Sequence, residues 1–161
     1  MTGQGRKTAP LDRILVVDPN MATAKLLAGL LRSLWPTVQV HGAQDSETAM
    51  VLAQVLEPEL VFVEAAGSGF DGLAFARTFR RSDFDFHETP LIMVLAEAKA
   101  AQVLAAREAG AHEFLRRPIS MGELERRLEA VSGPPRDFVE APHYIGPDPR
   151  RFNSARGGLD I

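Results

Sequence analysis

The fold class is decided by the stretch Ile14-Leu15-Val16-Val17-Asp18-Pro19-Asn20. Its first four residues form a continuous apolar run rich in β-branched side chains, which is typical of a strand buried on both faces. Asn20 is a favoured helix N-cap, and the leucines that follow it repeat at helical spacing until Pro36. The stretch therefore predicts one strand, a short turn and one helix.

The same alternation of strand and helix recurs four more times along the chain. Short apolar runs predict strands at residues 38–40, 60–63, 91–95 and 112–115. Helical spacing predicts helices at residues 45–56, 71–80, 99–109 and 120–131. Parallel strands joined by helical crossovers form a doubly wound (βα)5 α/β fold, in which the site lies at the carboxyl ends of the strands.

Two terminal segments are predicted to lie outside this fold. Residues 1–10 show no periodicity, and we expect them to be disordered. The run Ser132-Gly133-Pro134-Pro135 ends the last helix, and residues 133–161 form a Pro/Gly/Arg-rich tail with few apolar side chains. Because such a segment can bury little core, we predict a single domain at residues 11–132 followed by a disordered or extended tail.

The composition excludes several classes of protein. The 161 residues carry 18 Lys and Arg against 21 Asp and Glu, a net charge of −3 that argues against DNA binding. The absence of cysteine excludes disulfides, cysteine-ligated zinc, iron–sulfur clusters and thiol catalysis. No run reaches the ~20 apolar residues of a membrane span, and the polar start lacks the core of a signal peptide. We therefore expect a cytoplasmic protein without membrane insertion.

The four histidines give no indication of a metal site. They lie at positions 41, 87, 112 and 143, without the spacing of metal ligands, and we expect them on the surface. The sequence also contains no Walker loop and no Gly-x-Gly-x-x-Gly motif.

Four blocks at the predicted strand ends resemble the signature of the CheY-like receiver domain of bacterial response regulators. They are residues 14–20, then Glu64 with Gly69 and Asp71-Gly72, then residues 90–96, and then Leu115-Arg116-Arg117-Pro118. The blocks fall in the order and spacing of that family, and the resemblance extends from Leu11 to Ser132. It implies a flavodoxin-like sheet and a role in two-component signalling.

The residues that would carry receiver chemistry differ from the family pattern. The resemblance implies two acids that hold Mg²⁺ after the first strand, where this chain has Asp18-Pro19. It implies a phospho-accepting Asp, a Thr or Ser, and a Lys at the positions of Glu64, Leu95 and Arg117. Since phosphoryl transfer depends on positioned charge around the transferred group, we predict a pseudo-receiver that is not an enzyme, has no metal site and requires no cofactor.

Two interpretations of the remaining polar pair stay open. Glu64 and Arg117 are expected to face each other across neighbouring strand ends, where an arginine fork suits a carboxylate. A carboxylate longer by one methylene could imitate a phosphorylated Asp and hold an active-like state, or the pair could be a relic that satisfies buried charge. Phe114 occupies the position of the receiver switch aromatic. Packed inward, it would hold the face formed by residues 99–109, 112–115 and 120–131 in one shape for a partner. The alternative is a core phenylalanine without a switch role.

The tail contains a second informative segment between Tyr144 and Gly158. It combines arginines with residues that accept or donate hydrogen bonds, namely Asp148, Arg150, Arg151, Asn153, Ser154 and Arg156. Guanidinium groups bind guanine edges and phosphates. The segment resembles the Arg-rich extension of the CheY-like Cle proteins of alphaproteobacteria, which implies cyclic di-GMP binding and engagement of the flagellar motor. A solvated tail with chance arginines is the alternative.

The sequence thus favours a non-enzymatic signalling adaptor that docks to a protein, such as a histidine kinase or a flagellar motor component. The alternative is a cyclic di-GMP effector that uses its tail, and a residual phosphatase or phospho-acceptor comes third. A dimer formed through the helices at residues 99–109 and 120–131 is left open.

Overall fold

The computed structural model describes residues 9–67 and 69–151, and its centre is a five-stranded parallel sheet. The strand order is β2-β1-β3-β6-β7. The strands are β1 (Arg13–Val17), β2 (Gln39–Ala43), β3 (Leu60–Glu64), β6 (Leu91–Leu95) and β7 (Glu113–Arg116). The predicted doubly wound α/β fold is therefore confirmed, and β2 begins and ends later than the alternating residues 38–40 suggested.

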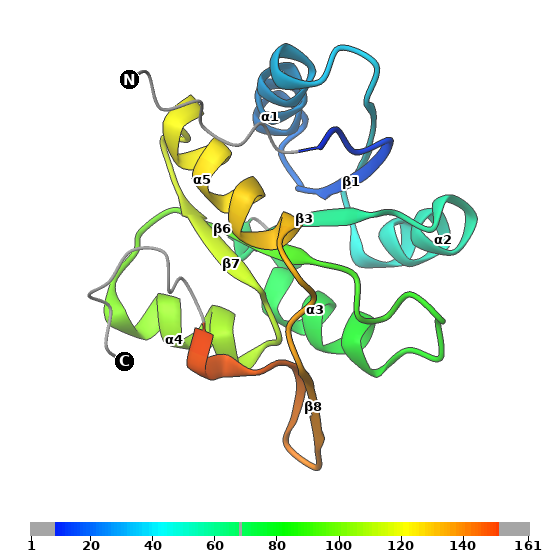
Figure 1. The fold of residues 1–161 in the computed structure, drawn as a ribbon, viewed down its shortest axis with the longest axis vertical. Helices are drawn as coiled ribbons and strands as arrows, with labels where there is room; N and C mark the ends of the chain where they lie inside the picture. The colour runs from blue at the N-terminus through cyan, green and yellow to red at the C-terminus, as the bar shows by residue number, and fades with distance from the viewer. Residues whose placement is uncertain (1–8, 68, 152–161) are drawn as a thin grey trace.

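Helices cover both faces of this sheet (Figure 1). On one face lie α1 (Met21–Leu34) and α5 (Met121–Ser132), and on the other lie α2 (Ser46–Leu56), α3 (Gly72–Arg81) and α4 (Ala100–Glu108). Alternate strand residues face opposite sides, so Ile14 and Val16 pack with α1 and α5, whereas Leu15 and Val17 pack with the other three helices. Two apolar cores thus enclose the sheet, as the continuous apolar runs predicted.

Side-chain caps fix where four of the helices begin. Asn20, Asp45, Asp71 and Ser120 each accept hydrogen bonds from backbone N–H groups of the first helical turn. Such caps contribute about 1 kcal/mol each. They also fix the turns at the carboxyl edge of the sheet, because α1, α3 and α5 begin there. Among the described residues, no helix combines the length and the apolar character needed to cross a membrane.

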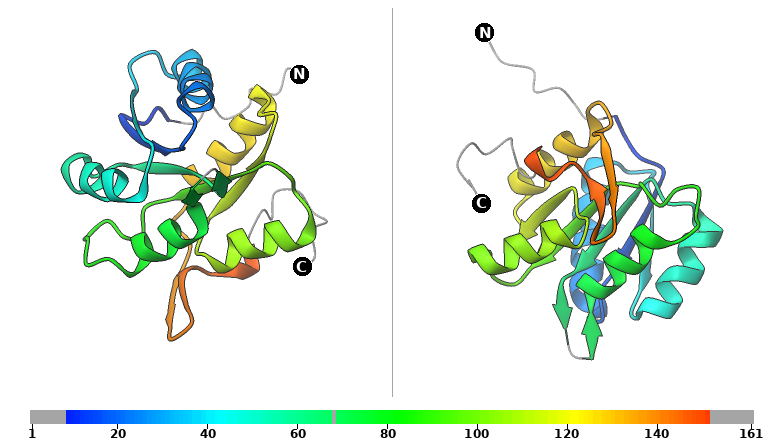
Figure 2. Two further views of the ribbon diagram at one scale, coloured as in Figure 1. Left: turned by 180° about the vertical axis from the view of Figure 1, so that it is seen from behind. Right: turned by 90° about the horizontal axis from the view of Figure 1, so that it is seen from below.

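The segment between β3 and α3, predicted as a loop, contains a small antiparallel ladder. It pairs β4 (Ala66–Gly67) with β5 (Phe70–Asp71) and extends beyond the sheet edge, as the right-hand view of Figure 2 shows. A Cβ on Gly67 would lie 2.5 Å from Cγ of Pro19. The ladder therefore lies directly against the turn that follows β1.

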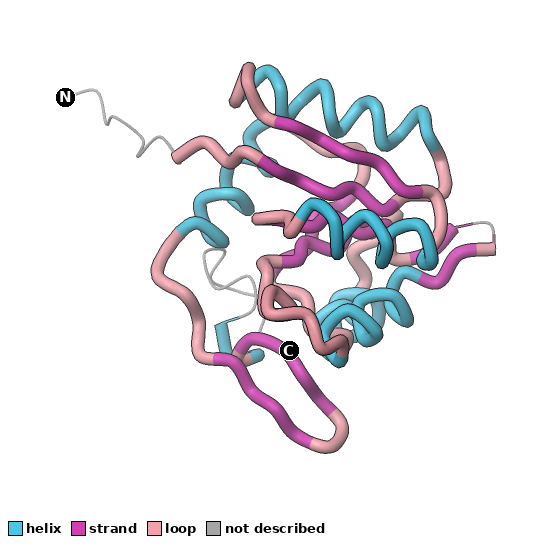
Figure 3. Tube along the Cα trace, turned by 90° about the vertical axis from the view of Figure 1, so that its right-hand side faces the viewer, coloured by secondary structure: helices cyan, strands magenta, loops and turns pink. Residues whose placement is uncertain are grey.

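The first half of the predicted tail is a docked β-hairpin. It pairs β8 (Phe138–Ala141) with β9 (Tyr144–Pro147) and is followed by the 3-10 turn η1 (Pro149–Arg151), as Figures 2 and 3 show. Its backbone packs so closely that a Cβ on Gly110 would lie 2.6 Å from the carbonyl oxygen of Ile145. The prediction of an unstructured tail is therefore wrong for residues 138–147, whereas residues 1–8 and 152–161 lie outside the described residues.

A buried arginine forms the centre of the hairpin's contact with the domain. Arg80 on α3 is 1% exposed, and its guanidinium donates to the carbonyl oxygens of Gly110, His87 and Thr89 at 2.7–2.9 Å. The ring of Phe138 on β8 covers the guanidinium at 5.1 Å, a cation–π contact. Burial lowers the pKa of Arg80 to about 9, so the group remains charged at neutral pH.

His112 completes this arrangement and corrects the prediction that the histidines lie on the surface. It is buried, 8% exposed, and its Nδ1 lies 2.9 Å from Nη2 of Arg80 and 3.3 Å from the amide nitrogen of Leu91. Because both neighbours are donors, Nδ1 must be the acceptor, and the ring is neutral with its proton on Nε2. Nearby, Arg136 donates to the buried carboxylate of Glu113 at 2.7 Å and fixes the segment that leads into β8.

Candidate functional site

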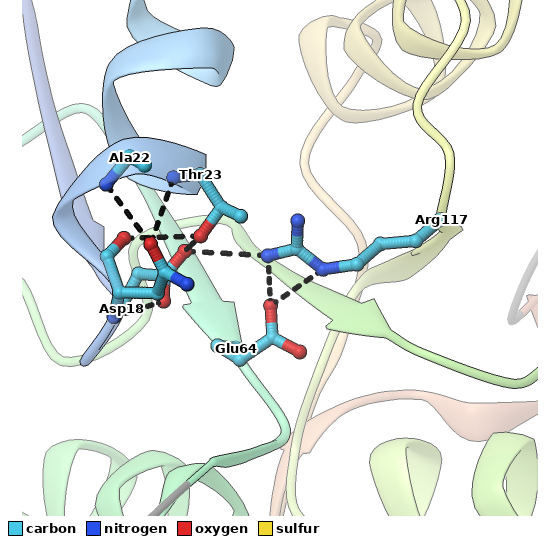
Figure 4. A network of polar contacts seen from close by, with 6 residues as sticks. Asp18, Ala22, Thr23, Glu64 and Arg117 are labelled. Carbon is cyan, nitrogen blue, oxygen red and sulfur yellow. Dashed lines mark hydrogen bonds and ion pairs between the residues drawn. The ribbon is translucent and has the colours of Figure 1, made fainter.

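The candidate site lies in an open groove of about 660 Å³ at the carboxyl edge of the sheet. Asp18 follows β1, Glu64 ends β3 and Arg117 follows β7, so three chain segments far apart in sequence meet there (Figure 4). The groove is lined by Asp18, Pro19, Asn20, Met21, Ala22, Thr23, Glu64, Ala66, Gly67 and Arg117. The strand-end rule therefore located three of the predicted site residues.

Asp18 is buried, and hydrogen bonds hold both of its carboxylate oxygens. Oδ1 accepts from the amide of Asn20 at 2.8 Å. Oδ2 accepts from the hydroxyl of Thr23 and from Nη2 of Arg117, the latter at 3.2 Å. Thr23 is a site residue that was not predicted from the sequence. Its position three residues after the cap Asn20 places it in the first turn of α1, beside Asp18.

Arg117 joins the two carboxylates. Its Nε donates to Oε2 of Glu64 at 3.1 Å, and its Nη2 donates to the same oxygen and to Asp18. The prediction that Glu64 and Arg117 lie at the ends of neighbouring strands is wrong, because β6 lies between β3 and β7. The arginine side chain therefore reaches across the end of β6, and its own amide bonds to the carbonyl oxygen of Leu95 at 2.9 Å.

Burial sets the electrostatics of this cluster. It raises the pKa of the Glu64 carboxyl; the hydrogen bond and charge of Arg117 oppose the rise, and the negative charge of Asp18 adds to it. For Arg117, burial lowers the pKa, but the hydrogen bond and charge of Glu64, together with Asp18, outweigh burial and raise it. One guanidinium thus serves two buried carboxylates, and the cluster has one excess negative charge.

The fourth position of the predicted degenerate phosphorylation site, at the end of β6, is occupied by the apolar residue Leu95. The Leu95 side chain is 2% exposed and belongs to the core between the sheet and α2, α3 and α4. It supplies no hydroxyl at the end of β6. The side chain of Pro19 lines the groove beside Asp18 and supplies no metal-ligating oxygen.

These residues do not fit the magnesium ion that the receiver fold implies. Mg²⁺ requires near-octahedral oxygen ligands, usually several from carboxylates. Here the oxygens of Asp18 are held by protein donors, and the guanidinium of Arg117 lies between Asp18 and Glu64. A fixed cation already provides the positive charge that a metal would supply.

Phe114 on β7 packs inward. It is 3% exposed and belongs to the same core as Leu95. Arg127 of α5 holds it from the other side, with its guanidinium 5.2 Å from the ring centroid and its Nε donating to the Phe114 carbonyl oxygen at 2.8 Å. Two further phenylalanines, Phe84 and Phe86, stack at 4.7 Å and pack against this core.

The structure describes part of the predicted nucleotide-binding segment. Asp148 and Arg150 pair with each other through several hydrogen bonds, and the Arg150 side chain is 87% exposed. They line a polar groove of about 520 Å³ together with Pro135, Arg136 and Asp137. Arg151 ends η1, whereas Asn153, Ser154 and Arg156 lie outside the described residues.

Fold and site together define a receiver-type signalling domain, with five parallel strands and acidic residues at the carboxyl ends of β1 and β3. The chain belongs to the response regulator receiver domain family, whose pattern matches residues 14–129. The hairpin and η1 follow that matched region.

Individual relatives agree with this assignment. The chain is 32% identical over 125 residues to a protein-glutamate methylesterase/protein-glutamine glutaminase of Nocardioides sp., covering 76% of this chain and 33% of that protein. It is 30% identical to the transcriptional regulatory protein BaeR of Escherichia coli, covering 76% and 50%. The chain thus spans a third to a half of the length of these curated relatives.

Solved structures show the same fold. The chemotaxis protein CheY4 of Vibrio cholerae superimposes with a TM-score of 0.68 at 20% identity, covering 75% of this chain and 98% of that chain. NtrX of Brucella abortus gives a TM-score of 0.67 at 26% identity, covering 76% and 27%.

Proposed function

We propose that this chain is a pseudo-receiver that acts by docking to a signalling protein without aspartyl phosphorylation. The observation that carries this proposal is the contact of Arg117 with both Glu64 and Asp18. In this arrangement the groove presents a completed ion-pair cluster in place of a free carboxylate beside a metal site.

The chemistry of the groove supports this proposal. A phospho-acceptor must offer a free carboxylate oxygen in line with the leaving group, and charge must be stabilised around the transferred phosphoryl group. Oε2 of Glu64 is occupied by two donors of Arg117, Oε1 is one methylene further from the backbone than the oxygens of an Asp acceptor, and Leu95 offers no hydroxyl. Each of these features opposes phosphoryl transfer, and so does the poor fit for Mg²⁺.

The packing of Phe114 supports a docking role for the face formed by α4, β7 and α5. Because the Phe114 ring is buried and Arg127 donates to its carbonyl oxygen, this face has a fixed shape for a protein partner. A histidine kinase or a flagellar motor component would be a partner of the proposed kind, and a dimer through the same face is an alternative use of it.

Intact-mass spectrometry tests the proposal. Incubation of the chain with acetyl phosphate and Mg²⁺ should leave its mass unchanged. The positive control is the quadruple variant Pro19→Asp, Glu64→Asp, Leu95→Thr and Arg117→Lys, which restores the receiver pattern and should gain one phosphoryl group. A phosphoryl gain by the unaltered chain that disappears in Glu64→Ala would refute the proposal.

A second candidate function is cyclic di-GMP binding through Asp148, Arg150, Arg151, Asn153, Ser154 and Arg156. The observation that favours it is the exposed guanidinium of Arg150, bonded to Asp148 beside a polar groove that Arg136 also lines. An arginine and an acceptor so arranged offer contacts for phosphate and for a guanine edge.

Calorimetry with cyclic di-GMP tests this candidate. The test variant is Arg150→Gln with Arg151→Gln, and the control is Arg126→Gln on α5, which leaves all six candidate residues intact. Deletion of residues 152–161 probes the rest of the segment while retaining the hairpin. Micromolar binding that the double variant loses and the control keeps would support the effector; no heat with the full chain would exclude it.

A further inference from the structure

We propose that His87, Glu88 and Glu140 form a binding site for a divalent transition-metal ion of the Zn²⁺ class, which joins hairpin β8–β9 to the domain. His87 and Glu88 belong to the segment between α3 and β6, and Glu140 lies on β8. One ligand atom from each side chain lies within 4.8 Å of the others. The site is separate from the groove at the carboxyl edge and does not depend on the proposed docking function.

The distance between the imidazole and the β8 carboxylate matches a shared metal ion. Nε2 of His87 lies 3.4 Å from Oε1 of Glu140. Zinc bonds to imidazole nitrogen and carboxylate oxygen are ~2.0–2.2 Å, and tetrahedral geometry then separates two ligand atoms by roughly 3.4 Å. The separation of these two atoms therefore equals that of two ligands of one tetrahedral ion. Glu88 is exposed, and a side-chain rotation would bring its carboxylate into the third position.

The hydrogen bonding of His87 leaves the correct nitrogen available. Its Nδ1 lies 3.0 Å from the carbonyl oxygen of Phe84, and because a carbonyl can only accept, Nδ1 carries the proton. In the neutral ring, Nε2 is then an acceptor that faces another acceptor, the Glu140 carboxylate. A metal ion bound between two such acceptors would be favourable to both. A ring N–H bonded to a carbonyl is also the usual second contact of a metal-binding histidine.

The surroundings hold this histidine in place. The backbone oxygen of His87 accepts from the buried Arg80 at 2.7 Å, and its ring meets Phe138 edge-on at 6.0 Å. Arg136 and Glu113 fix the start of the hairpin. Because both sides of the site are held by other contacts, the geometry does not depend on the metal being present, and a bound ion would add a link between segments distant in sequence.

The donor set indicates which ions would bind. An imidazole with carboxylates suits Zn²⁺ and neighbouring transition metals, whereas Mg²⁺ and Ca²⁺ prefer oxygen ligands throughout. Two carboxylates balance the charge of one dication. The ligands lie at the surface, so water can complete the coordination.

Zinc titration of the full chain, stripped with a chelator, tests the site. Isothermal titration calorimetry should show one Zn²⁺ per chain with a micromolar Kd. Mg²⁺ and Ca²⁺ should bind at least tenfold more weakly than Zn²⁺. Since a ligand of the folded state stabilises it, Zn²⁺ should also raise Tm and slow proteolytic cleavage within residues 138–147. His87→Gln and Glu140→Gln should each weaken Zn²⁺ binding at least tenfold, and Glu88→Gln should weaken it less.

His143→Gln is the matched control, because His143 lies exposed in the turn of the same hairpin. Its Zn²⁺ affinity should equal that of the unaltered chain. Absence of saturable binding at about 100 μM Zn²⁺ would overturn the proposal. Equal binding by His87→Gln would overturn it as well. If His87→Gln does not fold, Glu140→Gln on the exposed face of β8 provides the same comparison.

Discussion

Arg117 and Glu64 are bonded through two guanidinium nitrogens that converge on one carboxylate oxygen, across the end of a strand that separates them. The pair therefore connects β3 with β7 over β6, and Asp18 extends the connection to β1. Four of the five parallel strands are thus linked at their carboxyl ends by one ion-pair cluster and by the hydrogen bond from the Arg117 amide to the carbonyl oxygen of Leu95. The first two predictions concern this cluster.

Replacing Arg117 by methionine should destabilise the protein by about 3 kcal/mol, because it leaves two buried carboxylates without their cation. The value is at the low end of the range for buried pairs, since the Arg117 side chain is 29% exposed. Urea unfolding measures the change. The control Arg126→Met breaks the surface pair with Glu123 and should cost less than about 0.5 kcal/mol. Equal losses in the two variants would contradict a structural role for the cluster.

Glu64→Gln should weaken the affinity for the docking partner about tenfold, a typical coupling between distant sites, while the domain stays folded. If the pair holds an active-like state, that state is lost, because the amide cannot pair with Arg117 as a carboxylate does. Binding and thermal unfolding must be measured on the same sample. A folded variant with unchanged affinity would favour the alternative, a relic pair that only satisfies buried charge.

The stability of the protein should decline as the pH falls below about 6.5, partly because of His112. Burial lowers the pKa of His112 well below its usual 6.5, and the charges of Arg80 and Arg136 add to this effect. The unfolded chain therefore binds a proton that the folded chain does not, at a cost of up to about 1.4 kcal/mol per pH unit. His112→Asn keeps an acceptor for Arg80 but cannot titrate, so its unfolding free energy should depend less on pH between 6.5 and 5. Identical pH profiles would rule out this contribution.

Gly110→Ala should displace the hairpin and destabilise the protein by about 1–3 kcal/mol. Gly110 has a φ of +99°, and its added Cβ would meet the carbonyl oxygen of Ile145 at 2.6 Å. The control is Gly29→Ala on the exposed face of α1, where a Cβ meets nothing within 4 Å, and where alanine should stabilise the helix by about 0.5–1 kcal/mol. Limited proteolysis should cut the hairpin faster in Gly110→Ala alone; equal rates would contradict the close packing described here.

The strands, the helix cap Asn20 and three site residues could be predicted because local patterns specify them. Apolar runs such as Ile14–Val17 identify buried strands, and the strand-end rule brings Asp18, Glu64 and Arg117 to one edge. The path of Arg117 over β6 could not be read in this way, since it depends on the length of one side chain and on the strand order.

The hairpin could not be predicted, because its contacts depend on distant residues. Phe138 and Ile145 belong to two short apolar pairs, Phe138-Val139 and Tyr144-Ile145, among polar residues and turn formers, which is typical of a tail. Their partners, Arg80 and Gly110, resemble an ordinary basic residue at a helix end and an ordinary helix-terminating glycine. The burial of Arg80 and His112 could not be predicted either, because the hairpin and the start of β7 enclose them only in the folded chain.

The docked hairpin gives the molecule two opposite poles. The groove lies at the carboxyl ends of the strands, whereas the hairpin contacts Gly110, just before β7 begins, and covers Arg80, which donates to the carbonyl oxygen of Thr89 just before β6. Five-residue strands of roughly 17 Å separate the two. A label attached at His143, in the exposed turn of the hairpin, would therefore lie at the pole opposite the groove.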